Sequence, residues 1–132
     1  MKPCYVFDIC AEVYLEARGA SERNIGALRV EAPYKYIWRP DVLPRPVDYV
    51  ADFYRAGQRA LRTPRLRGRR RMFVLFYCEL ADYHAARVRL GISELTWADW
   101  RDEIRNLVGR ELLRAGIFPP GSYFHRSDAR QA

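Results

Sequence analysis

The sequence is poor in the residues that build disulfides, metal sites and acid–base centres. Its 132 residues include three cysteines, Cys4, Cys10 and Cys78, and two histidines, His84 and His125. No CxxC pair occurs, and a zinc site needs ligand pairs at closer spacing than these residues provide. An odd number of such cysteines is typical of free thiols in a reducing compartment. We therefore expect no disulfide, no metal and no cofactor.

Long apolar runs and catalytic motifs are also missing. No apolar segment approaches the roughly 20 residues that cross a membrane, and residues 1–10 lack the hydrophobic region of a secretory signal. The neighbouring carboxylates Asp102 and Glu103 have no nucleophile, histidine or glycine-rich loop beside them. These absences predict a cytoplasmic protein that is not an enzyme and has no membrane partner.

Lysine is scarce, and arginine carries the positive charge. Twenty-one of the 23 basic residues are arginine, the net charge is +7, and the pI is near 9.7. Codon usage in a GC-rich genome is the simpler explanation of the arginine excess, although arginine also binds phosphate bidentately. The charge favours anionic partners, nucleic acid above all. It is concentrated between Arg55 and Arg71, where eight arginines occur without an acid.

The length and composition predict one globular core. Hydrophobic residues make up 49% and aromatic residues 14%, which excludes a disordered chain. The stretch "RPDVLPRP" (Arg39–Pro46) holds three prolines and is expected to be a rigid connector. It separates an N-terminal extension, residues 1–45, from a helical domain, residues 46–116, and a C-terminal tail, residues 117–132. We expect the extension to mediate dimerisation or a partner contact.

The N-terminal extension is expected to be irregular, with one short helix and room for one short strand. Apolar residues at helical spacing predict a helix from about residue 9 to 18, ended by Gly19. The segment "YKYIW" (Tyr34–Trp38) has the aromatic and β-branched content of a strand. Its aromatic side chains are suited to packing on a core more than to stacking on bases.

The helical domain begins with an amphipathic pattern. Val47, Val50, Tyr54 and Leu61 are spaced for one face of a helix over residues 46–62.

The next segment is expected to break that helix. Pro64 and Gly68 should prevent a continuous helix through the arginine run of residues 62–71. The following "MFVLFYCEL" (Met72–Leu80) is apolar on nearly every side, and the helical pattern after it favours a buried helix over a buried strand.

The stretch "YHAARVRLGISELTWADW" has the signals of two helices joined by a tight corner. Gly91 permits a left-handed backbone between them, and Ser93 is a good N-cap for the second helix. That helix should run to about Ala115 and bury one stripe, formed by Trp97, Trp100, Ile104, Leu107, Val108 and Leu112. The apolar, non-helical "IFPPGSYF" (Ile117–Phe124) should fold back on the core.

Together, "MFVLFYCEL", "YHAARVRLGIS" and "ELTWADWRDEIRNLV" resemble the helix-turn-helix of transcription regulators, and most closely region 4 of sigma factors. The resemblance covers about residues 69–108. It implies a mainly α, helix-turn-helix bundle in which a short positioning helix precedes a helix that reads DNA. Arg87 stands where that family usually has a small alanine, and Ala86 lies one position earlier, which predicts a slightly longer positioning helix.

The resemblance implies duplex DNA as a partner, and a transcription regulator of the type found on phages, plasmids and integrative elements. RNA polymerase is a further expected partner, as for phage antitermination factors, and a homodimer is expected as well. Phosphate contacts are expected from Arg65, Arg67, Arg69, Arg70, Arg71, Arg87 and Arg89. Further contacts are expected from Ser93, Thr96, Arg101, Arg105 and Asn106.

The charge of the second helix leaves an alternative open. Residues 81–115 carry six arginines and six acids, so the presumed reading helix brings no net positive charge. Glu94, Asp99 and Asp102 would instead suit an adaptor that presents an acidic helix to a basic protein partner. A third hypothesis, RNA binding through the arginine run, lacks a recognised RNA-binding motif.

Overall fold

The structure, a computed structural model, describes residues 1–30 and 44–124, with the backbone alone for residues 20–30, 44–45, 122 and 124. Within these ranges every regular element is a helix, which confirms the prediction of a mainly α bundle. The expected strand, Tyr34–Trp38, lies outside the described residues.

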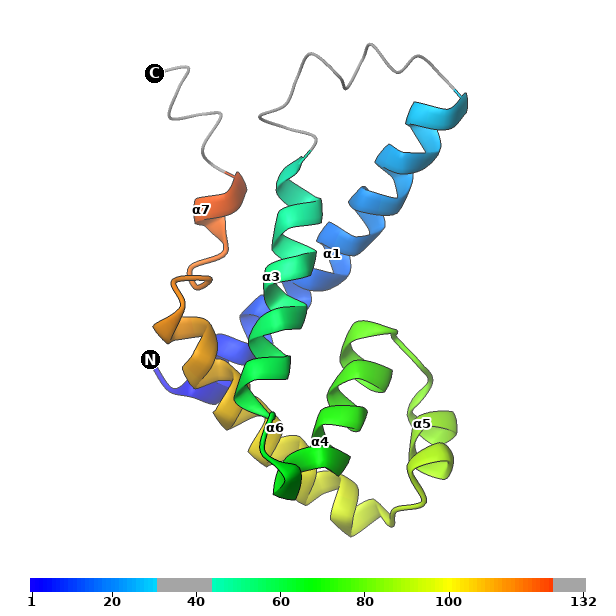
Figure 1. Ribbon diagram of the computed structural model, residues 1–132, viewed down its shortest axis with the longest axis vertical. Coiled ribbons are helices and arrows are strands. Elements are labelled where there is room, and N and C mark those ends of the chain that lie inside the picture. The colour runs from blue at the N-terminus through cyan, green and yellow to red at the C-terminus, as the bar shows by residue number, and fades with distance from the viewer. Residues whose placement is uncertain (31–43, 125–132) are drawn as a thin grey trace.

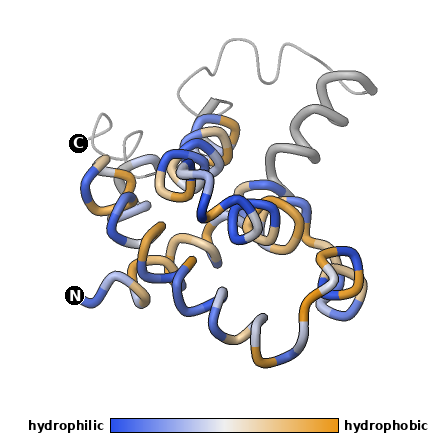
Figure 2. The backbone as a smooth tube through the Cα atoms, turned by 60° about the horizontal axis from the view of Figure 1, so that its bottom comes forward, coloured by the Kyte–Doolittle hydropathy of each residue, from blue (hydrophilic) through white to orange (hydrophobic). Residues whose placement is uncertain are grey.

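Three long helices form the body of the molecule. Helix α1 (Pro3–Val30) and helix α3 (Pro44–Ala60) pack on each other, and helix α6 (Glu94–Arg114) packs against both (Figure 1). Hydrophobic and hydrophilic residues alternate along these helices, as expected for helices with one buried face (Figure 2). Residues 3–17 thus share one core with the helical domain.

Aromatic rings fill the centre of this core. Phe53 of α3 lies 4.7 Å from the ring of Tyr14 and 6.0 Å from that of Phe7, measured between centroids. The phenols that reach the core find backbone acceptors: the Tyr49 hydroxyl donates to the Cys10 carbonyl at 2.8 Å. Such hydrogen bonds offset the cost of burying the polar end of an aromatic side chain.

Helix α1 corrects the prediction of a short helix at residues 9–18. It begins at Pro3, a residue suited to the first turn, and continues through Gly19 to Val30. A glycine in a helix costs only about 1 kcal/mol relative to alanine, which is too little to end a helix by itself. The buried residues of α1 are Val6, Phe7, Cys10, Tyr14 and Ala17.

Helix α3 buries only part of the face that the sequence indicated. Val47 and Tyr54 are exposed, whereas Val50 is half-buried against the core and Leu61 is fully buried. The other residues that turn inward are Tyr49, Phe53 and Ala56.

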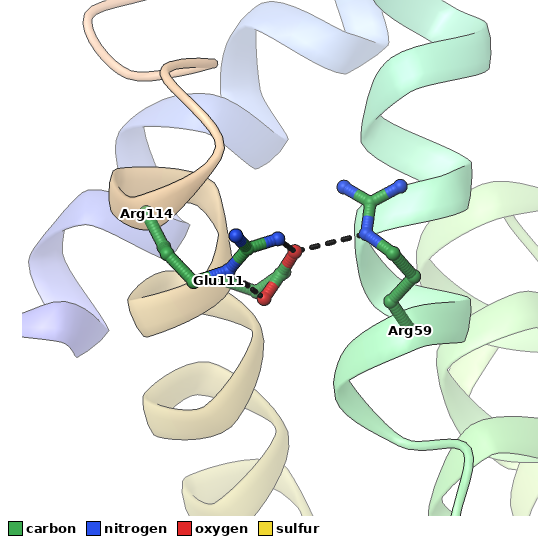
Figure 3. A network of polar contacts seen from close by, with 3 residues as sticks. All are labelled: Arg59, Glu111 and Arg114. Carbon is green, nitrogen blue, oxygen red and sulfur yellow. Dashed lines mark hydrogen bonds and ion pairs between the residues drawn. The ribbon is translucent and has the colours of Figure 1, made fainter.

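An ion-pair network joins α3 to α6. Glu111 of α6 accepts hydrogen bonds from Arg114, one turn further on, and from Arg59 of α3 at 2.9 Å (Figure 3).

After α3 the chain makes a short 3₁₀ turn, η1 (Pro64–Leu66), then helix α4 (Arg67–Met72) and a π-helical turn, η2 (Phe73–Cys78). The predicted break at Pro64 is confirmed, and the predicted break at Gly68 is wrong. A Cβ atom at Gly68 would lie only 2.5 Å from the nearest carbon of the Trp100 ring, and the two would collide. Gly68 is thus used for close packing on α6.

The chain end of the described region folds back on α3, as predicted. Ile117 is buried, and the Tyr123 hydroxyl donates to the Asp52 carboxylate at 2.6 Å. The expectation of a non-helical tail is wrong for one turn, since Gly121–Phe124 form helix α7.

Candidate nucleic-acid interface

Helix α5 (Tyr83–Leu90), the turn at Gly91 and the start of α6 form a corner, here called the α5–α6 corner. Gly91 has φ 66°, in the left-handed region that the sequence predicted for it. Ser93 caps α6, because its Oγ accepts from the Thr96 N–H at 3.1 Å. Ser93 also donates to the Thr96 hydroxyl at 3.1 Å. The predicted boundaries of this corner are confirmed.

Ala86, rather than Arg87, fills the position of a small buried residue in α5. Ala86 is fully buried, whereas Arg87 is half-buried. The Arg87 Nη1 donates to the Ile92 carbonyl across the turn at 3.2 Å, and its guanidinium lies 5.8 Å from the Tyr83 ring centroid. Arg87, expected to contact phosphate, thus stabilises the turn.

Two tryptophans anchor the amino-terminal half of α6. The ring of Trp97 meets Phe76 of η2 and Tyr83 of α5 edge to face, each at 5.0 Å between centroids. Trp100 packs against Gly68, and the Arg69 guanidinium lies 5.1 Å from its ring centroid. The inward orientation predicted for both tryptophans is confirmed, and it fixes how α6 lies against α4, α5 and η2.

Several predicted contact residues are engaged inside the protein. Arg69 Nε donates to Glu103 at 2.7 Å, and Arg105 binds Asp8 of α1 with 2.9 and 2.6 Å hydrogen bonds. The side chains of Arg69 and Arg105 are only 19% and 17% exposed. Asn106 donates to the carbonyl of the residue four positions before it, at 2.9 Å. The two guanidinium groups connect helices and have little freedom to meet a ligand, whereas Asn106 remains exposed.

Other predicted contact residues remain on the surface. Arg65, Arg67, Arg71 and Arg89 are exposed, and in the part of the chain that the structure describes none of them forms an ion pair. The same holds for Arg101, on the exposed face of α6. These side chains are available to an anion.

Three arginines from two helices line one surface cavity of about 250 Å³, which we call the basic hollow. Arg70 and Arg71 reach it from α4, and Arg89 reaches it from the last turn of α5. The remaining walls are formed by Gln58, Val74, Leu75 and Glu79. The Arg70 Nη1 is held by the Arg62 carbonyl at 3.3 Å.

The charge of the basic hollow favours a bound anion. Three arginines and one acidic residue, Glu79, line the hollow, and no ion pair within 4.0 Å joins Glu79 to them. Like charges that converge repel one another, and a bound anion relieves that repulsion. The cavity is smaller than the roughly 300–1,000 Å³ of small-molecule sites, so a phosphate group suits it better than a whole cofactor.

The exposed face at the start of α6 has the opposite charge. Residues 94–102 carry three carboxylates, Glu94, Asp99 and Asp102, against the single guanidinium of Arg101. Leu95 stands among them with 80% of its surface exposed. This face is acidic with one apolar side chain, and the positive charge lies on α4 and α5.

The sequence identified the arginines of the basic hollow but not their meeting point. Nothing in the local pattern shows that Arg89 lies opposite Arg70 and Arg71, because their approach depends on how α5 packs on α4. Gln58 and Glu79 carry no local signal for a site at all.

Comparison of the chain with known protein families, with curated proteins and with solved structures finds no match. Across residues 1–30 and 44–124, no helix combines the length and the apolar character that a membrane crossing requires. Within the same ranges, no three potential metal ligands cluster.

Proposed function

We propose that the protein binds duplex DNA and that the basic hollow holds a backbone phosphate. The observation that carries this proposal is that Arg70, Arg71 and Arg89 line one surface cavity of about 250 Å³, which has room for a backbone phosphate. Guanidinium groups bind phosphate through paired hydrogen bonds, which are stronger than those between neutral groups. Exposed Arg65 and Arg67 extend the positive surface from the same segment of the chain.

The α5–α6 corner fits this mode of binding. In helix-turn-helix proteins the first helix of the corner crosses the DNA backbone, and the second enters the major groove. Here the first helix, α5, contributes Arg89 to the basic hollow. Phosphate contacts fix position and supply affinity without reading sequence. A role in transcription, with RNA polymerase as a further partner, is part of the same proposal.

The side chains at the start of α6 can make only a few contacts with DNA bases. Arg101 is its exposed cation, and carboxylates can only accept hydrogen bonds, which limits them in the major groove to the amino groups of cytosine and adenine. Because Arg105 is held by Asp8, we exclude it from the proposed base contacts. Affinity should thus depend mainly on phosphate contacts and be strongly salt-dependent.

Binding of the full chain to random-sequence duplex DNA tests the proposal. Fluorescence anisotropy at about 50 mM salt should show binding that weakens steeply as salt is raised. Absence of binding at that salt concentration would contradict the proposal.

A second candidate, a protein-interaction adaptor, is favoured by the acidic face and by the exposed Leu95. Exposed apolar side chains ringed by charge are common where partners bind. RNA polymerase is the probe for this candidate, in a pull-down with the full chain. The double variant Asp99→Lys with Asp102→Lys should abolish capture of the polymerase and leave or strengthen DNA binding. The control Glu12→Lys, on α1, should leave capture unchanged.

A further inference from the structure

A second cavity, of about 550 Å³, lies between α1 and η2, and we call it the apolar groove. Phe7, Ala11 and Leu15 line it from α1. Phe76, Tyr77, Leu80 and Ala81 line it from η2 and the segment that follows. Its volume falls within the roughly 300–1,000 Å³ of small-molecule sites, which are mostly apolar with a few polar groups.

Large apolar side chains are exposed on both walls of the apolar groove. Leu15 is 51% exposed and Leu80 is 44% exposed. Leu80 also has φ 61°, a left-handed conformation that costs a residue with a side chain about 1 kcal/mol or more. Strain of this kind is concentrated at ligand-binding sites, and here it falls on a residue of the groove wall.

The wall of the groove that η2 forms is tied to the wall that α1 forms. The Tyr14 hydroxyl donates to the Cys78 carbonyl at 2.8 Å, and Arg18 donates to the same carbonyl. These contacts clamp the end of η2 to α1, so the walls keep their separation. When a ligand binds to a largely preformed cavity, fewer side chains have to become ordered, so the entropic cost of binding is smaller.

The polar groups of the groove favour an anionic head group. Arg101 has no ion pair in the described part of the chain and lies beside the Tyr77 phenol. Burial raises the pKa of Tyr77 more than hydrogen bonding with Arg101 lowers it, so the phenol keeps its proton at neutral pH. Arg101 and Tyr77 together offer two kinds of donor to one carboxylate.

Two carboxylates also line the groove, and neither cancels this preference. Asp8 is neutralised by its two hydrogen bonds with Arg105. Glu12 forms no ion pair with Arg101 in the described part of the chain, so the guanidinium keeps its charge for a ligand.

We propose that the apolar groove binds a small apolar molecule that carries a carboxylate, with its apolar part between Leu15 and Leu80 and its carboxylate at Arg101. This site does not depend on DNA binding. The two cavities share one element, however, because η2 supplies Phe76 and Tyr77 to the groove and Val74 and Leu75 to the hollow. A π-helical turn is a rare element that occurs frequently at functional sites.

Calorimetric titration with dodecanoate tests the site. Dodecylamine, which has the same chain length and the opposite charge, serves as the control ligand, and both are used below their micelle concentrations. Dodecanoate should bind one per chain, and dodecylamine should bind at least about ten-fold more weakly. Arg101→Gln should weaken dodecanoate binding about ten-fold, whereas Arg110→Gln, an exposed arginine of α6 outside the groove, should leave it unchanged.

A third variant tests the apolar part of the groove. Ala11→Trp should fill the cavity and abolish binding, and Leu15→Gln should weaken binding if Ala11→Trp does not fold. The proposal is overturned if neither ligand binds, if dodecylamine binds as tightly as dodecanoate, or if Arg101→Gln or the folded groove variant has no effect. Because the titration contains no DNA, its outcome is separate from that of the DNA-binding experiment.

Discussion

The Arg105 guanidinium binds the Asp8 carboxylate through two hydrogen bonds, 2.9 Å from Nε to Oδ1 and 2.6 Å from Nη2 to Oδ2. The pair joins α6 to the first turns of α1, and 97 positions of sequence separate its members. An arginine that would be a plausible base contact on an isolated helix is therefore a link between two helices in the folded protein.

Arg105→Gln should lower the free energy of unfolding and leave the sequence preference for DNA unchanged. Asp8→Asn should have a similar effect, and a double-mutant cycle measured by urea unfolding should give a coupling energy of about 1 kcal/mol. Arg110→Gln, an exposed arginine of the same helix, is the matched control. A changed sequence preference with unchanged stability would show that Arg105 reads a base.

The network around Glu111 predicts loss of stability in acid. Hydrogen bonds from Arg114, and from Arg59, lower the pKa of Glu111 from 4.5 to about 2 (Figure 3). Because the folded state favours the ionised form, the contribution of this group is complete above pH 4.5 and is lost as the pH falls toward about 2. Glu111→Gln should therefore destabilise the protein at pH 7 and flatten the pH dependence within that window.

Urea unfolding of this variant at several pH values between 2 and 7 measures the effect, with Glu12→Gln as an exposed control. An unfolding free energy of Glu111→Gln that still falls across the window as steeply as in the unsubstituted protein would contradict this assignment.

Gly109 is the point of closest approach between α6 and the start of α1. A Cβ atom at this position would overlap the carbonyl oxygen of Pro3, which is a backbone atom and cannot rotate away. Gly109→Ala should thus destabilise by about 2 kcal/mol, even though alanine favours a helix by about 1 kcal/mol. Thermal unfolding checks this, with the exposed neighbour Arg110→Ala as control. Equal or higher stability of Gly109→Ala would mean that α1 does not pack this closely.

Local signals in the sequence were sufficient for the α5–α6 corner. Gly91 and Ser93 determine where one helix ends and the next begins through their own backbone and side-chain hydrogen bonds, so the prediction needed no tertiary contact. The buried stripe of α6 was likewise predictable, because its period is that of a helix.

Features set by contacts between distant segments were not predictable in this way. The buried face of α3 is one case, because the rings of Phe7 and Tyr14 from α1 pack on Phe53. The arginines show the same limit, since their number can be counted in the sequence but their partners cannot. Arg69 is neutralised by Glu103, 34 positions away, whereas Arg71 has no ion pair in the described ranges.

The salt dependence of DNA binding by a variant of the basic hollow tests the central claim most directly. Arg71→Gln with Arg89→Gln removes two charges from the hollow. Arg55→Gln with Arg110→Gln removes the same charge from exposed positions that do not line it. A plot of log affinity against log salt concentration should become shallower for the hollow variant, by about 0.9 for each phosphate that the variant no longer neutralises, on any duplex sequence. The control variant should keep the original slope. Equal slopes for the two variants, or unchanged affinity in the hollow variant, would contradict a phosphate site at Arg70, Arg71 and Arg89.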